Sequence, residues 1–189
     1  MSRHIITEPV AITETEMNEV CQYSARPLKA DQIYCFCVLI CDNEIDRDEE
    51  KFSVPALRKL AELFRGRTSI FDHGPRGDNQ TARIYKTEIK TFAEELTQDG
   101  EEYTALIGYA YMVRTEANRP LIEDIDNGVK KEVSISCSMA KKTCSICGCN
   151  QFVERCKHIK GAIYGDGNGS FCYYLLEEPI DVYEWAFVG

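Results

Sequence analysis

The sequence predicts an α+β fold, in which a mainly antiparallel β-barrel or sheet of about six to seven strands is flanked by helices. Three observations favour this class. Strand-like and helix-like segments follow one another without the strict alternation of a βαβ protein. The 189 residues are 44% apolar and 10% aromatic, which is enough for one ordinary core. Four of the ten cysteines fall within thirteen residues, which predicts a small metal-stapled insertion.

Composition and charge exclude several classes of protein. The formal net charge is −9 and no basic run occurs, so we expect no binding to nucleic acid. The longest apolar run, residues 35–41, is far shorter than the ~20 residues that span a bilayer. The N-terminus lacks the basic start and the apolar core of a signal peptide. These features predict a cytosolic protein without a membrane segment.

The first half of the chain contains an arm, a buried strand and a helix. Residues 1–32 show no clean periodicity and are expected to form an extended N-terminal arm. Residues 33–41 are apolar throughout and predict a buried strand. A helix is predicted over 53–66, because Ser53 is placed to cap it and Gly66 is a natural stop.

The second half is richer in strands. A second helix is predicted over 119–128, with Pro120 at its start and Gly128 at its end. The strand candidates are 81–92, 102–113, 131–140, 171–176 and 180–188.

A cluster of cysteine and histidine predicts a structural zinc site. The pair Cys144 and Cys147 is followed, after eight residues, by Cys156 and His158. Zinc takes four tetrahedral thiolate or imidazole ligands, so these four residues would close the site to a catalytic water. Cys149 is a spare thiol that could replace one of them. The expected domains are the arm at 1–32, a core at 33–143 and 165–189, and a zinc-binding insertion at 144–164.

Residues 131–140, KEVSISCSMA, place three serines on one face of a predicted strand. Successive side chains alternate between faces, so Ser134, Ser136 and Ser138 share one side and the apolar residues share the other. The pattern is typical of a half-buried strand, and it also presents candidate nucleophiles.

Any serine nucleophile in this chain would depend on His73. A serine hydroxyl reacts only when a base takes its proton, and histidine is the usual base. The chain has three histidines, of which His4 lies in the arm and His158 belongs to the metal cluster. By exclusion, His73 in SIFDHG is the candidate base.

Several short motifs, in this order, resemble the prohead (capsid maturation) serine proteases of tailed phages. They are FDHG, a following strand that contains ARI, VSIS on a later strand, and YEWAFV near the end of the chain. The insertion CSICG…CKHIKG is similar to that of some members from phages of Gram-positive bacteria. The similarity covers most of the chain after the arm.

This resemblance implies a serine endopeptidase with a fold akin to the herpesvirus assembly proteases, a β-barrel flanked by helices. Its implied substrates are the phage scaffold and major capsid proteins, cleaved inside the immature shell. The implied location is the host cytoplasm, inside the procapsid. Kinship with dimeric viral proteases hints at self-association.

By position, the resemblance assigns Ser134 as the nucleophile and His73 as the general base. Glu184 is the first choice for the acid that orients the imidazole, and Asp181 is the alternative. Three residues apart in a strand, these two carboxylates should face opposite sides. Ser136 stands where the family usually has glycine, which makes it a competing nucleophile.

Two other functions stay open at this point. A non-catalytic, zinc-stabilised phage head or tube assembly protein would tolerate changes at His73 and Ser134, but not at Cys144 or Cys156. A metal-dependent hydrolase centred on the cysteine cluster would need an open coordination position.

Overall fold

The computed structural model describes residues 6–166 and 169–189 and confirms the predicted α+β class. His4 lies outside the described residues. The helices are α1 (Glu14–Cys21), α2 (Val54–Phe64) and α3 (Arg119–Asp126), with short 3-10 helices η1 (Ala30–Gln32) and η2 (Gly77–Asn79). The strands are β1 (Ile6–Pro9), β2 (Ile33–Asp42), β3 (Glu50–Phe52), β4 (Ser69–Phe71), β5 (Arg83–Leu96), β6 (Glu102–Val113), β7 (Val133–Cys144), β8 (Ile163–Tyr164), β9 (Ser170–Phe171) and β10 (Tyr174–Phe187).

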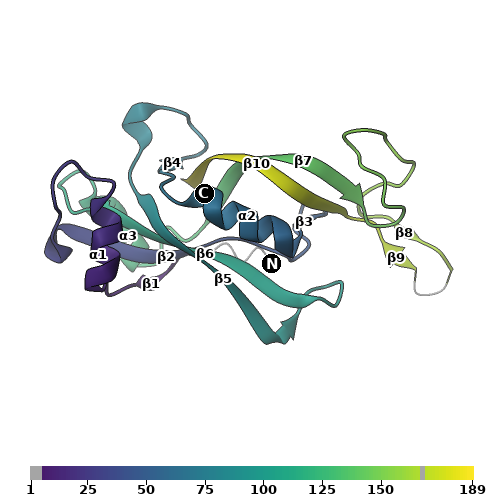
Figure 1. Ribbon diagram of the computed structural model, residues 1–189, viewed down its shortest axis with the longest axis horizontal. Coiled ribbons are helices and arrows are strands. Elements are labelled where there is room, and N and C mark those ends of the chain that lie inside the picture. Colours follow the sequence, from purple (N-terminus) through teal and green to yellow (C-terminus); the bar gives the residue numbers. More distant parts are fainter. Residues whose placement is uncertain (1–5, 167–168) are drawn as a thin grey trace.

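Two open sheets form the body of the protein (Figure 1). The first is antiparallel, in the order β1-β2-β6-β5. In the second, β10 is central, because it pairs in parallel with β3 and β4 and antiparallel with β7. Within the described ranges neither sheet closes on itself, so the predicted barrel is not formed and the alternative, a sheet, is observed.

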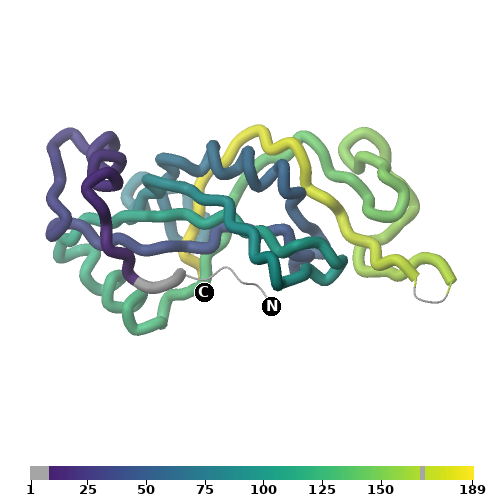
Figure 2. Tube along the Cα trace, turned by 60° about the horizontal axis from the view of Figure 1, so that its bottom comes forward, coloured from purple at the N-terminus to yellow at the C-terminus, as the bar shows by residue number. Residues whose placement is uncertain are grey.

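The molecule is elongated, with α1 and the insertion at opposite ends (Figure 2). The insertion contains β8, and it protrudes beyond the long arms of β7 and β10. From there β10 runs back into the body of the protein. The strand that leaves the insertion is therefore the same strand that forms the centre of the second sheet.

Strand β2 is apolar from Ile33 to Cys41 because both of its faces are covered. Phe36 and Val38 belong to the main core, which lies on the side of α2 and the second sheet. Ile33 and Cys35 face the other way and pack in a second cluster with Val20 of α1. A strand covered on both faces needs apolar residues at every position.

Helix α2 packs against both sheets and joins them. The Ser53 hydroxyl caps it as predicted, accepting a hydrogen bond from the Ala56 amide at 3.2 Å. Leu57, Leu60 and Phe64 are fully buried in the main core. Burial of each such side chain contributes roughly 1.5–3 kcal/mol to folding.

Helix α1 corrects the expectation that the N-terminal arm is extended. Thr13 and Glu16 form a capping box, in which the hydroxyl accepts from the Glu16 amide and the carboxylate accepts from the Thr13 amide. This T-x-x-E spacing is the sequence signal that could have revealed the helix. Glu16 also accepts a hydrogen bond from Lys86 of β5 at 2.9 Å, which ties α1 to the first sheet.

Strand β10 is continuous where the sequence predicted two strands, 171–176 and 180–188. It pairs with β7 along its whole length. A register shift next to Pro179 interrupts the ladder, and Glu178 adopts a φ of 54°. The chain therefore bends at these residues without ending the strand.

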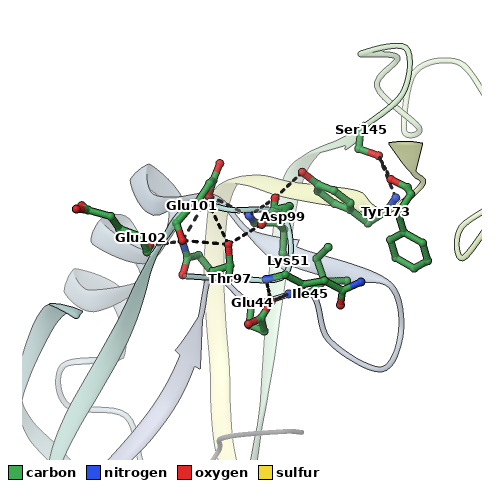
Figure 3. Close-up of polar contacts among 12 residues, drawn as sticks. Glu44, Ile45, Lys51, Thr97, Asp99, Glu101, Glu102, Ser145 and Tyr173 are labelled. Atoms are coloured by element: carbon green, nitrogen blue, oxygen red, sulfur yellow. Dashed lines mark hydrogen bonds and ion pairs between the residues drawn. The ribbon is translucent and has the colours of Figure 1, made fainter. Parts of the chain in front are cut away.

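A buried lysine ties the β5–β6 turn to the second sheet and to the end of the insertion (Figure 3). Lys51 of β3 has a fully buried side chain and donates to Asp99 at 2.6 Å and to Glu101 at 2.9 Å. Asp99 also accepts from the Tyr173 hydroxyl at 2.7 Å. Burial opposes ionisation of Asp99, but hydrogen bonds led by that from Lys51 outweigh it and lower its pKa. The buried ammonium is thus paired, as a buried charge must be.

We expect the hydrogen bond between Glu16 of α1 and Lys86 of β5 to stabilise the protein in a pH-dependent way. The hydrogen bond from Lys86, followed by that from the Thr13 backbone, lowers the pKa of Glu16 from 4.5 to about 2. A depressed carboxyl pKa stabilises the fold fully above the unfolded value of 4.5, and this contribution is lost as the pH falls toward 2. Glu16→Gln should therefore lower the free energy of unfolding at pH 7 by about 1 kcal/mol.

Urea unfolding of the two proteins between pH 3 and pH 7 measures this difference. It should shrink steadily below about pH 4.5. Glu14→Gln is the matched control, because Glu14 lies exposed on the same helix and no shift should result. An equal effect of both substitutions at every pH would contradict the role given to Lys86.

Candidate functional site

His73 lies in a sharp turn after β4 and contacts a carboxylate of β10. Asp72 and His73 have φ values of 49° and 54°, in the left-handed region that residues with side chains seldom adopt. Nδ1 of His73 is 2.7 Å from Oε1 of Glu184. Since a carboxylate only accepts, Nδ1 donates this bond, and in the neutral ring Nε2 is then the acceptor. The structure thus brings together two of the three predicted triad residues.

The register between β7 and β10 puts the serines on the same face as this pair. Ser134 lies opposite Ala186, and Ser136 lies opposite Glu184. Residues opposite each other in an antiparallel ladder share a face. The core-facing side of the same strands carries Val133 and other apolar residues. The serine face is therefore the face on which Glu184 meets the imidazole.

The same register distinguishes Ser134 from Ser136 as partner of the imidazole. Ser134 is diagonal to Glu184, so the two residues lie up to ~7–8 Å apart in the ladder, whereas the Cβ of Ser136 is directly opposite that of Glu184, at ~4.5–5.5 Å. The diagonal position leaves room for the ring, and Ala186 between them presents only a methyl group. Sheet geometry therefore favours Ser134 over Ser136.

The structure corrects the expectation that Asp181 and Glu184 face opposite sides. A register shift between Val182 and Glu184 inserts an extra residue in β10, so Asp181 lies opposite Ser138 and both carboxylates share the serine face. The two carboxylates differ instead in the side chains that they bind. Asp181 binds Nη2 of Arg67 at 2.8 Å, and Glu184 binds the imidazole. Glu184 is accordingly the acid that reaches His73.

The second oxygen of Glu184 is buried and unsatisfied. Oε2 has no hydrogen-bond partner among the described residues. A buried acceptor without a donor costs about 1–3 kcal/mol, so a donor is expected to reach it in the working protein. Ser136 is the closest hydroxyl in register. Ser136 is therefore better placed to donate a hydrogen bond to Glu184 than to act as the nucleophile.

A cleft of about 400 Å³ lies elsewhere, beside the buried lysine (Figure 3). It is lined by Asp99 and Tyr173 from the lysine cluster and by residues of the insertion such as Ser145 and Ile146. None of the triad candidates lines it. The cleft is therefore no part of the candidate active site.

The four residues predicted as metal ligands come together at the start of the insertion. One donor atom from each of Cys144, Cys147, Cys156 and His158 lies within 4.8 Å of all the others. A tetrahedral ion with metal–sulfur bonds of about 2.3 Å needs donors about 3.8 Å apart, so the cluster could hold a metal ion. Nδ1 of His158 is buried and has no hydrogen-bond partner among the described residues, which also fits a ligand.

The chemistry of the Cys156 thiol agrees with metal binding. Burial opposes ionisation of Cys156, but hydrogen bonds from the His158 backbone and then Gln151 outweigh it and lower the pKa to about 6. A thiol with such a pKa is largely the thiolate that a metal binds. The spare Cys149 lies outside the cluster and donates to the Glu154 carbonyl at 2.8 Å.

A fifth cysteine, Cys172, adjoins the cluster and was not predicted from the sequence. It is fully buried, and burial, followed by the nearby Cys144, raises its pKa to about 11. Cys172 therefore stays a thiol beside the cluster. No spacing pattern marks it, because it lies sixteen residues beyond Cys156 on the returning chain.

The insertion has little apolar core of its own. Its large apolar side chains are mostly exposed, namely Phe152, Val153, Ile159 and Ile163 at 56%, 83%, 70% and 69%. A unit this small cannot hold its shape by burial alone and needs a staple. The cluster of Cys144, Cys147, Cys156 and His158 could provide one by holding a metal ion.

No protein-family model, curated protein or solved structure matches the chain. In the part of the chain that the structure describes, no helix is both long and apolar enough to cross a bilayer.

We expect the purified protein to contain one metal ion per chain, measured by elemental analysis of protein prepared without chelators. Cys156→Ser should lose the ion, because a hydroxyl replaces a thiolate ligand. Amide exchange in 144–164 should then rise, while β2 stays protected.

Cys149→Ser serves as the matched control and should retain the ion, since Cys149 bonds a carbonyl instead. Equal metal loss from both variants, or a metal-free wild type, would contradict the assignment of ligands.

Proposed function

We propose that this protein is a serine endopeptidase of the prohead protease type, which cleaves scaffold and capsid proteins during phage head maturation. One observation carries the proposal: Nδ1 of His73 bonds Glu184, on the sheet face that carries Ser134. An acid, a base and a hydroxyl in this arrangement are the parts of a serine hydrolase.

In the proposed reaction Ser134 attacks the peptide carbonyl while Nε2 of His73 takes the hydroxyl proton. The same nitrogen then gives this proton to the leaving amine, which departs as the new N-terminus. Water, deprotonated by His73, hydrolyses the acyl ester and frees Ser134. Glu184 holds Nδ1–H and stabilises the imidazolium that forms in each step.

We infer that the metal is a structural Zn²⁺. Three thiolates and an imidazole are a donor set that zinc prefers, and four protein ligands leave no position for water. This closed site argues against a metal-dependent hydrolase. Zinc would hold the insertion in shape, at the far end of the strand that bears Glu184.

The proposed partners are the phage scaffold and major capsid proteins, met in the host cytoplasm inside the procapsid. The resemblance of FDHG, VSIS and YEWAFV to the prohead proteases supports these partners, and self-association stays a hypothesis from the same source. An acidic chain without a basic run does not favour nucleic acid as a partner.

The nucleophile can be tested by co-expression with the scaffold and major capsid proteins of the same phage, followed by intact mass analysis. Wild type should trim these proteins. Ser134→Ala should reduce trimming by at least about 10³-fold, since the hydroxyl forms the acyl intermediate. Ser138→Ala is the matched control on the same face and should trim normally.

Ser136→Ala decides between the two neighbouring serines, and it should retain trimming within about tenfold because Ser136 is not the nucleophile. Loss of trimming in Ser136→Ala alone would keep the mechanism and move the nucleophile by two residues. Identical, untrimmed masses for all variants in assembled shells would favour the non-catalytic assembly protein.

The acid is tested by Glu184→Gln and Asp181→Asn in the same assay. The first replaces the carboxylate with a neutral amide whose NH2 group can donate to Nδ1 and fix the wrong tautomer of His73, so trimming should fall by about 10³–10⁴-fold. The second removes a half-exposed pair with Arg67 and should change the rate by less than about threefold. The reverse order of effects would make Asp181 the acid.

A further inference from the structure

We propose that Asn79 is a positioning residue for His73, acting through the strained turn that carries the imidazole. The inference rests on the proposed function, because it concerns how the base of that mechanism is held. Asn79 ends the 3-10 helix η2, six residues beyond His73, and touches neither Glu184 nor the serines in the contacts that the structure describes.

The side-chain amide of Asn79 clamps both ends of the turn. Its Nδ2 donates to the carbonyl of Phe71 at 3.0 Å and to the carbonyl of Gly74 at 3.0 Å. These carbonyls stand immediately before Asp72 and immediately after His73. The side chain of Asn79 therefore fixes the distance between the two ends of the turn that carries His73.

The turn needs such a clamp because its conformation is unfavourable by itself. Two consecutive residues with side chains, Asp72 and His73, have positive φ values of 49° and 54°. This conformation persists only where surrounding contacts over-determine it, and such residues gather at functional sites. The Asp72 amide bonds the Phe187 carbonyl at 3.0 Å, which anchors the turn to β10.

Gly74 is part of the same arrangement. A Cβ added there would lie 3.2 Å from Nδ2 of Asn79 and 3.3 Å from the Phe71 carbonyl oxygen. Both contacts are tighter than ordinary van der Waals distance, so any larger residue would press on the clamp. Gly77, three residues on, has nothing within 4 Å of the corresponding position.

The clamp positions the base without touching the substrate. With the turn held, Nδ1 reaches Glu184 at 2.7 Å, and Glu184 lies on the sheet face that carries the serines. If the turn relaxes, the ring moves away from Glu184 and from this face. A displacement of about 1 Å costs as much as 10²-fold in rate.

The test uses Asn79→Asp, which has the shape of asparagine but lacks both N–H donors, together with Asn79→Ala. Each should lower kcat for trimming by about 10–100-fold with KM little changed, because the substrate still binds. Asp78→Ala is the control, since Asp78 makes only an exposed ion pair with Arg76 on the same short helix. Its rate should equal that of wild type.

A second readout does not depend on activity. In a Ser134→Ala background, the proton on Nδ1 of His73 should give a downfield NMR signal that Asn79→Asp abolishes through faster exchange with water. The midpoint of urea unfolding should fall only slightly. Gly74→Ala should act like Asn79→Asp, and Gly77→Ala like wild type.

The outcomes separate the inference from the proposed function. An unchanged Nδ1 proton signal and an unchanged kcat in Asn79→Asp would overturn the inference and leave the protease intact. A wild type that trims nothing would overturn the protease, and the NMR signal would still decide whether Asn79 positions His73. A general loss of stability with signals broadened throughout the protein would make Asn79 a residue of the fold alone, and would also overturn the inference.

Discussion

The pairing of β10 with β4 on one side and β7 on the other is the interaction on which the rest of the structure depends. It carries Glu184 between the strand that leads to His73 and the strand that bears Ser134. The same strand buries Trp185 and Phe187 in the main core. A hydrogen-bonded ladder fixes register to a single residue, because a slip of one would send every side chain to the other face.

An extra residue in β10 allows this strand both to bury apolar residues in the core and to present two carboxylates on the serine face. Val182 and Trp185, three apart, are both fully buried, which a regular strand would not permit. The bulge that allows this also keeps Asp181 and Glu184 on the serine face. Each carboxylate then has its own cation or imidazole, so two acids lie side by side without sharing a partner.

Different chemistry holds the two ends of this strand. At the inner end, apolar burial among β10, α2 and β2 dominates. At the outer end the insertion exposes its apolar residues. The groups that can hold this end are the ion pairs of Lys51 and a Cys3His cluster that could bind a metal ion. Charged and metal-binding groups can stabilise this end of the strand because each of them has a partner. The outer end should consequently respond to metal loss far more than the inner end does.

The sequence by itself determined the α+β class, helix α2 from its Ser53 cap, and the four residues that could hold a metal ion, because these depend on composition, periodicity and short spacing. It also singled out His73 by exclusion and named Glu184 before Asp181. Tertiary structure decided which acid meets the imidazole, since a bulge in β10 puts both carboxylates on one face and the positions of Arg67 and His73 then distinguish them. It alone brought Cys172 beside the metal cluster and Asn79 onto the turn of His73. Such contacts follow from long-range register and backbone strain, which no local pattern of residues encodes.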